Sequence, residues 1–262
     1  MPTGPAVAII DDHPITGAGI AALLSQHGFT VVAVVMAVEK LSCAADVVVS
    51  DLRLPGRSGT EAIAYLAERG CRVIATSGVA RREEILDVIA AGARGFVPKT
   101  GPAPVFVRAV SDVMRFSYFL SPDLAHLILA DADLRPLAAG DLGDTERTVL
   151  ALAEQGEDAG EVAASLHVPP EEFAGLLAPI WAAAVTRRSQ FRPSPREREL
   201  MRLAAEGRTH KQAAASMSIT AVTVSGYLKS VKSKYLATHP QVPEAIAPLT
   251  AARTWAQELG LG

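Results

Sequence analysis

Five short runs of β-branched and other apolar residues recur along the first half of the chain, and they constrain the fold more than any other feature. The runs cover 6–10, 30–35, 46–50, 72–76 and 94–97, and helical stretches with one apolar face lie between them. Continuous apolar strands separated by helices are typical of a parallel sheet that helices cover on both faces. We therefore predict an α/β fold, a doubly wound five-stranded parallel sheet, followed by all-α domains.

Chemically active side chains follow four of the five predicted strands. The first strand leads into Asp11 and Asp12, the third into Asp51, the fourth into Ser77 and the fifth into Lys99. Such sheets bind ligands beyond the carboxyl ends of their strands. Clustered carboxylates repel one another, and a hard divalent cation such as Mg²⁺ relieves that repulsion while leaving room for phosphate oxygens. The pattern predicts that Asp51 is a nucleophile toward a phosphoryl group.

Two other functions, dinucleotide binding and phosphatase activity, have partly matching motifs in the same region. The stretch "GAGIAA" (17–22) fits a dinucleotide-binding fingerprint, but "DDHPIT" separates it from the strand that it should follow directly. A phosphatase with an aspartyl nucleophile would carry a second acid two residues after Asp51, where this chain has Arg53. Each residue alone also has a structural explanation, because acids at strand ends often cap turns. The joint pattern favours the phosphoryl site.

Four motifs that contain these strand ends together resemble a known family. "IIDDHP", "SDLRLPGRSG", "ATSG" and "GARGFVPK" are similar to the receiver domain of two-component response regulators, and "DDHP" is similar to the NarL/FixJ branch in particular. The resemblance covers about residues 5–118 and implies the flavodoxin-like receiver fold. It departs from the family at Thr100, where many receivers have proline after the lysine.

This resemblance also implies roles for individual residues. Asp51 would accept a phosphoryl group from a histidine kinase, and Phe96 would be the aromatic switch residue. Ser77 and Lys99 would contact the phosphoryl group. The ligands of Mg²⁺ would be three carboxylates and one backbone carbonyl, those of Asp11, Asp12, Asp51 and Arg53.

The second half of the chain contains a repeat. Residues 144–185 align without a gap to residues 195–236 at an offset of 51, with ten identical pairs, which indicates a duplicated helical unit. In the second copy, Ser194 and Glu197 form a capping-box pattern at the start of a helix. A short helix, the turn "SIT" and a recognition helix over 221–236 then predict a helix-turn-helix. Five residues of this last helix are expected to face the core: Val222, Val224, Leu228, Val231 and Tyr235.

The second copy resembles the LuxR/NarL-type DNA-binding domain from "SPRERE" to "KSKYL". That resemblance implies that Thr223, Ser225 and Lys229 approach bases or nearby phosphates, and that Lys211 and Lys232 contact the backbone. Many family members carry lysine in place of Ser225 and a larger residue than Gly226, so phosphate contacts should matter more here.

The first copy has the opposite charge. Eight acids and one base give residues 144–185 a net charge of −7, whereas eight bases and three acids give residues 194–236 a net charge of +5. An acidic surface is repelled by DNA phosphates, so we expect the first copy to be a packing or dimerisation module. The linker between the copies is expected over 186–195, and a last helix over 249–259 with Trp255 and Leu259 inward.

These patterns together predict a transcription regulator that is not an enzyme in its output. The expected domains are a receiver over 1–118, a connecting segment over 119–143, a degenerate helix-turn-helix-like domain over 144–186, and a DNA-binding domain with a C-terminal helix over 187–262. The expected partners are a histidine kinase, double-stranded DNA and a second copy of the chain, with no membrane. A signalling adaptor that acts through protein contacts of the acidic copy is the alternative.

Composition places limits on the setting. Cys43 and Cys71 are the only cysteines, and no apolar run approaches the roughly 18 residues of a membrane span. The N-terminus has no basic region ahead of its short apolar run, so we expect no signal peptide. A cytoplasmic protein without a Cys/His metal site is the expectation.

Overall fold

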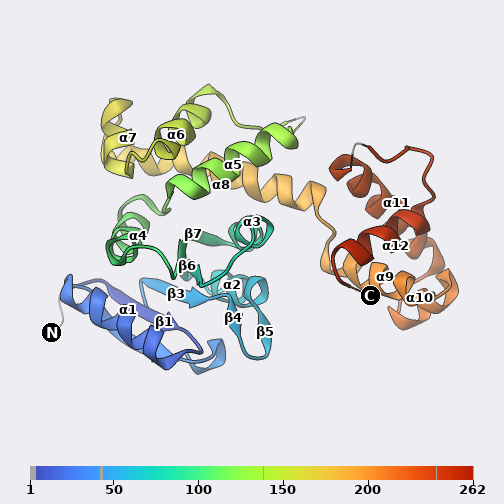
Figure 1. The fold of residues 1–262 in the computed structure, drawn as a ribbon, viewed down its shortest axis with the longest axis horizontal. Helices are drawn as coiled ribbons and strands as arrows, with labels where there is room; N and C mark the ends of the chain where they lie inside the picture. Colours follow the sequence, from blue (N-terminus) through green and yellow to red (C-terminus); the bar gives the residue numbers. More distant parts are fainter. Residues whose placement is uncertain (1–3, 42–43, 138, 240, 262) are drawn as a thin grey trace. The chain divides into compact units, whose positions relative to one another are not determined.

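The computed structural model describes residues 4–41, 44–137, 139–239 and 241–261, so that Cys43 lies outside the described residues. The chain divides into two compact units, residues 1–186 and residues 187–262, and each is described by itself (Figure 1). No helix among the described residues is long and apolar enough to cross a membrane.

A five-stranded parallel sheet forms the centre of the first unit. Its strands are β1 (Ala6–Ile10), β2 (Thr30–Val35), β3 (Val47–Asp51), β6 (Arg72–Ser77) and β7 (Ala93–Pro98), in the order β2-β1-β3-β6-β7. All neighbouring pairs are parallel, so the predicted sheet and its five strands are confirmed. The order reverses at β1, between β2 and β3, where open sheets place their ligands.

Helices cover both faces of this sheet, because successive strand residues point to opposite sides. In β1, Val7 and Ile9 pack with α1 (Pro14–Gln26) and α4 (Ala103–Phe116). Ala8 and Ile10 belong to the other core, with α2 (Gly59–Glu68) and α3 (Arg82–Ala90).

The connections beside the sheet are short. Between β2 and β3 the described residues form only the 3₁₀ turn η1 (Val38–Lys40). A small antiparallel pair, β4 (Arg53–Leu54) with β5 (Arg57–Ser58), follows β3 and was not expected from the sequence.

Further helices complete the first unit: α5 (Pro122–Leu134), α6 (Asp144–Glu154), α7 (Ala159–Ser165) and α8 (Pro170–Phe191) as far as residue 186. They share one apolar core with the sheet. The Phe173 ring meets the Phe116 ring edge-on at 5.5 Å between centroids. Trp181 stacks on Tyr118 at 4.5 Å and donates its indole N–H to the backbone carbonyl of Ala93, at 3.0 Å. The acidic copy is therefore packed against the sheet and its helices.

The expected linker over 186–195 is only partly irregular, because α8 continues to Phe191. Pro179 lies inside this helix. A proline removes one backbone N–H from the helix ladder, but it does not end a helix whose apolar side is held by tertiary packing.

The second unit contains α9 (Pro195–Ala205), α10 (His210–Ser216), α11 (Ala221–Thr238) and α12 (Pro248–Glu258). Its core is built from residues of all four helices, among them Met201, Leu228 and Trp255. Capping boxes start α9 and α10, at Ser194 with Glu197 and at Thr209 with Gln212.

Two side chains that were expected in this core lie outside it. Val222 is 81% exposed, because Val224, Leu228, Val231 and Tyr235 form the buried side of α11 and a residue two positions before Val224 points the opposite way. Leu259 is 41% exposed just beyond the end of α12, whereas Trp255 is buried as expected.

The two copies repeat one another in structure as well as in sequence. The helices α6 and α9, and likewise α7 and α10, begin and end at residues 51 apart, and α8 and α11 begin 51 apart. The turn before the last helix of each copy has one residue in the left-handed region, His167 at φ 56° and Ser218 at φ 55°. Gly156 and Gly207 end the first helices with positive φ in the same way.

Candidate functional site

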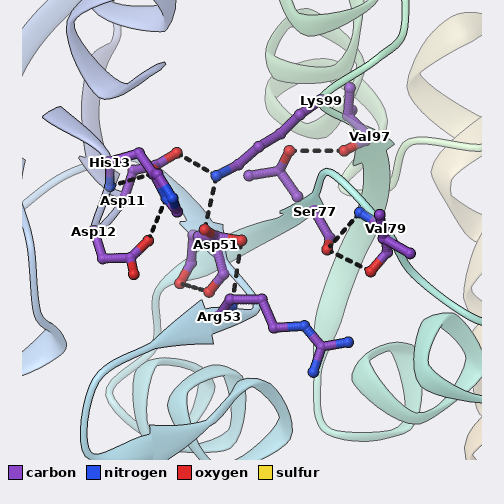
Figure 2. A network of polar contacts seen from close by, with 11 residues as sticks. Asp11, Asp12, His13, Asp51, Arg53, Ser77, Val79, Val97 and Lys99 are labelled. Atoms are coloured by element: carbon purple, nitrogen blue, oxygen red, sulfur yellow. Dashed lines mark hydrogen bonds and ion pairs between the residues drawn. The ribbon is translucent and has the colours of Figure 1, made fainter. Parts of the chain in front are cut away.

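Three carboxylates and one lysine meet at the carboxyl edge of the sheet (Figure 2). Asp11 follows β1 and Asp51 ends β3; both are 2% exposed. The Lys99 ammonium, just after β7, lies 2.7 Å from Asp11 Oδ2 and 2.7 Å from Asp51 Oδ2. The parallel order of β1, β3, β6 and β7 brings these side chains together from segments far apart in the sequence.

The lysine is held in its charged form by its neighbours. Burial alone lowers the pKa of the Lys99 ammonium, but hydrogen bonds and attraction to Asp11 and Asp51 outweigh burial and raise that pKa above its ordinary value. The site therefore contains a fixed positive charge between two buried negative ones. Such a group can pair with an anion that arrives at either carboxylate.

The acids lie close enough together to share a metal ion. Ligand atoms of Asp11, Asp12, His13 and Asp51 all lie within 4.8 Å of one another. Oxygen donors at this density fit a hard divalent cation. Arg53 donates its backbone N–H to Asp51 Oδ1 at 3.3 Å, which fixes the carboxylate from the following turn.

His13 is the member that the sequence interpretation did not assign. Its Nδ1 lies 2.7 Å from Asp12 Oδ1, and its backbone N–H donates to Asp11 Oδ1 at 2.9 Å. The signal was its position directly after the two acids in "DDHP", at the start of α1.

Ser77 lies at the rim of the cluster, but its hydroxyl is turned toward its own loop (Figure 2). It donates to the Val79 carbonyl at 3.0 Å and accepts from the Val79 N–H at 3.3 Å. Thr76, opposite Asp51 in the sheet, donates to the Val97 carbonyl at 2.8 Å. The structure thus brings Asp11, Asp12, Asp51 and Lys99 together but leaves the Ser77 hydroxyl outside their contacts.

A cavity of about 490 Å³ lies beside Ser77. Its walls come from the loop after β6, from α3, from β7 and from α5, and they include Phe96 and Leu124. Phe96 is 6% exposed and belongs to the core shared with α5. A movement of Ser77 or Phe96 would therefore change the packing against α5.

The second unit carries a different kind of surface. Lys211 and Lys229 are exposed on α10 and α11, and Lys232 is partly exposed. The hydroxyls of the other two predicted contacts have local partners, since Ser225 donates to the Ala221 carbonyl at 3.1 Å and Thr223 meets Thr220 at 2.9 Å.

Lys234, by contrast, serves the interior. Its ammonium lies 2.9 Å from Glu197 Oε2, and Ser230 donates to the other oxygen of that carboxylate at 2.6 Å. Burial raises the pKa of Glu197, but the hydrogen bonds from Lys234, Ser230 and the Ser194 backbone lower that pKa by more than burial raises it. The net shift of the Glu197 pKa is therefore downward. This lysine therefore ties α11 to α9 and is not part of the exposed basic surface.

Comparisons with known proteins match both parts of the chain. Residues 7–111 match the family model of the response regulator receiver domain, and residues 194–242 match that of the bacterial regulatory proteins of the luxR family. The chain is 30% identical to BvgA of Bordetella pertussis over 174 residues, which is 62% of this chain and 82% of BvgA.

Two other relatives are similar over shorter stretches. The DNA-binding transcriptional activator DevR/DosR of Mycobacterium tuberculosis is 32% identical over 162 residues, 57% of this chain and 74% of that protein. The transcriptional regulatory protein DesR of Bacillus subtilis is 30% identical over 123 residues, 47% of this chain and 58% of DesR. Among solved structures, a LuxR-family two-component response regulator from Aurantimonas covers 50% of this chain, with 99% of its own length, at 27% identity and a TM-score of 0.47.

Proposed function

The chain belongs to the NarL/FixJ response regulators, transcription regulators that join a receiver to a LuxR-type DNA-binding domain, and on this premise we propose that Asp51 is its phosphoacceptor. The observation that carries the proposal is the pairing of Asp51 with Lys99 at 2.7 Å, at the tip of the central strand and beside two further acids. The donor would be the phosphohistidine of a histidine kinase.

The proposed reaction moves one phosphoryl group. A carboxylate oxygen of Asp51 attacks phosphorus, a P–O bond forms, the P–N bond of the phosphohistidine breaks, and the leaving imidazole takes a proton from solvent. The phosphorylated Asp51 no longer carries a carboxylate charge. The Lys99 ammonium then pairs with the negatively charged phosphoryl oxygens instead. The Lys99 side chain suits this role, because its raised pKa keeps it protonated and positively charged throughout the physiological range.

We assign Mg²⁺ to the cluster of Asp11, Asp12 and Asp51, with the Arg53 carbonyl as a further ligand. The cation would supply compensation for the charge on the phosphoryl oxygens. The donor set supports this assignment, because hard cations prefer oxygen ligands and the acids already lie within 4.8 Å of one another. His13 would keep Asp12 oriented through their 2.7 Å contact.

Ser77 would respond to the new group by exchanging partners. Its hydroxyl leaves the Val79 carbonyl and donates to a phosphoryl oxygen, so that the loop after β6 moves toward Asp51. Phe96 then repacks in the cavity that it shares with α5. An addition of about two negative charges at one point is enough to bias such a local change.

The output would be duplex binding by the second unit. Lys211, Lys229 and Lys232 would contact phosphates, and Thr223 and Ser225 would approach the bases. We further propose a homodimer that binds two-fold DNA sites in the cytoplasm. Of the domain limits predicted above, we keep that of the DNA-binding domain, because the receiver, the connecting segment and the acidic copy share one compact unit. The relatives' names favour transcription regulation over the adaptor alternative.

Intact-mass measurement tests the phosphoacceptor. The protein is incubated with a small phosphodonor and Mg²⁺, and wild type is expected to gain the mass of one phosphoryl group while Asp51→Asn gains none. Asp46→Asn is the matched control, because Asp46 lies just before the opposite end of the same strand and should leave the gain unchanged. Uptake by Asp51→Asn equal to that of wild type would overturn the assignment.

A further inference from the structure

The outer side of the recognition helix α11 is formed by four residues that lie opposite its buried side. Val222, Gly226, Lys229 and Ser233 recur every three or four positions, and all four are exposed. We call this set the reading face. It contains one charge, one hydroxyl, one bare backbone position and one fully apolar side chain.

Val222 is the unusual member of this face. Its side chain is 81% exposed in the first turn of α11, one of the most exposed large apolar side chains among the described residues. The hydroxyl groups beside it are already engaged, with Thr223 bonded to Thr220 and Ser225 bonded to the helix backbone. The methyl groups of Val222 are therefore what the first turn presents most openly.

Gly226 lies one turn further along the same face. A Cβ at this position would meet no atom within 4 Å, so the packing of the protein does not require glycine there. Glycine weakens the interior of a helix relative to alanine. The missing side chain instead leaves open backbone beside Val222, which lets this side of α11 approach another surface closely.

The first residues of a recognition helix contact base edges in the major groove. A valine offers no hydrogen bond, and the thymine C5-methyl group is the apolar feature that base pairs present there. We propose that Val222 reads thymine through its C5-methyl group, and so selects T·A pairs at one position of each half-site. This inference rests on duplex binding by the second unit.

Removal of single methyl groups from DNA tests the inference. The full chain first selects its preferred duplex from a random library, and the affinity for that duplex is measured. Each thymine is then replaced in turn by deoxyuridine, which lacks only the methyl group. For wild type, the replacement at one position per half-site should weaken binding about fourfold, the effect expected for one buried methyl-sized group.

The variant Val222→Ala should bind the selected duplex more weakly than wild type and lose its sensitivity to deoxyuridine at that position. Leu259→Ala is the matched control, because Leu259 is an exposed apolar residue of the same unit, outside α11, and this variant should keep the wild-type response. Thermal unfolding should be unchanged for Val222→Ala, since the side chain is exposed.

The outcomes separate the inference from the function beneath it. If wild type binds a selected duplex and Val222→Ala responds to every deoxyuridine as wild type does, the thymine assignment is wrong and DNA binding stands. If wild type selects no duplex, with or without phosphodonor, the DNA-binding function fails and the inference fails with it.

Discussion

Single residues decide the electrostatics of both units, and Lys99 is the clearest case in the first. Its ammonium lies between two buried carboxylates, so removing it leaves two negative charges close together. We predict that Lys99→Met lowers the free energy of unfolding of the first unit by about 3 kcal/mol. Urea unfolding measures this, and Lys40→Met, at an exposed lysine of the same unit, should change little.

The pH dependence of that loss follows from the raised pKa of Lys99. A lysine whose pKa is raised on folding contributes fully below its unfolded value, about 10.4, and loses its contribution as pH rises through the folded pKa. The difference between wild type and Lys99→Met should therefore be constant from pH 7 to 9 and shrink above about pH 11. A difference that disappears already at pH 8 would contradict the ion pairs.

Glu197 is the buried charged residue of the second unit that corresponds to Lys99. Its pKa shifts downward on folding, whereas that of Lys99 shifts upward. The contribution of Glu197 is therefore present above the unfolded value of about 4.3 and is lost as pH falls through the folded pKa. We predict that Glu197→Gln costs about 2 kcal/mol at pH 7 and that the cost decreases below pH 4. Denaturant unfolding over this pH range checks it.

Glu199 supplies the comparison for this measurement. It pairs with Arg196 at 2.9 Å on the same helix, but both side chains are substantially exposed. Solvent screens such a pair, so Glu199→Gln should cost about 0.5 kcal/mol or less. Equal losses for the two variants would show that burial of the Glu197 carboxylate does not matter.

At the scale of elements, the two copies use equivalent positions of their last helices for different purposes. Residues 229 and 232 of α11 are lysines, and the residues 51 positions earlier, Ala178 and Trp181 of α8, line a cavity together with sheet and α2 residues such as Ala93 and Ala67. In the first copy, the position equivalent to Lys232 is therefore occupied by a buried tryptophan that packs on the receiver, whereas Ala178, at the position equivalent to Lys229, stays exposed.

This packing predicts a large effect at Trp181. Truncation to alanine removes a buried ring, its stacking on Tyr118 and its hydrogen bond to the Ala93 carbonyl. We expect Trp181→Ala to lower the stability of the first unit by about 3–5 kcal/mol. Trp181→Phe should lower the stability of the first unit by less than Trp181→Ala, because it keeps an aromatic ring.

Calorimetry of the full chain distinguishes the two units in this experiment. Trp255→Ala is the matched variant, because Trp255 is equally buried but belongs to the core of the second unit. The Trp181 variant should shift the unfolding transition of the first unit and the Trp255 variant that of the second. A shift of the same transition by both variants would refute the division.

At the scale of the whole molecule, charge is distributed by segment. The net charge of −3 combines a segment of −7 over 144–185, one of +5 over 194–236, and −1 from the remaining residues. Duplex affinity should therefore fall steeply with salt although the chain as a whole is acidic. In a plot of log affinity against log salt, Lys211→Ala and Lys229→Ala should each reduce the slope by about one.

Lys40→Ala is the control for that titration, since it changes the net charge of the chain equally in the other unit. If Lys40→Ala reduced the slope as much as Lys229→Ala, net charge and not the basic surface of α10 and α11 would govern binding.

Much of this architecture could be predicted, because local patterns carried it. The alternation of apolar strands and amphipathic helices predicted the sheet, and the strand ends predicted Asp11, Asp51 and Lys99 as neighbours. Features set by tertiary contact could not be predicted. The continuation of α8 past Pro179 is such a feature, because it depends on the packing of its apolar side. Two other differences were local: the Ser77 hydroxyl bonds to Val79 in its own loop, and helical periodicity places Val222 opposite Val224.

The edge-on contact of Phe116 with Phe173 and the indole bond to Ala93 have a practical meaning for modular engineering. A receiver cut from this chain at residue 118 would lose the helices that cover one wall of its core and would present that wall to water. To transplant this sensor onto a foreign output, the fusion joint belongs after residue 186.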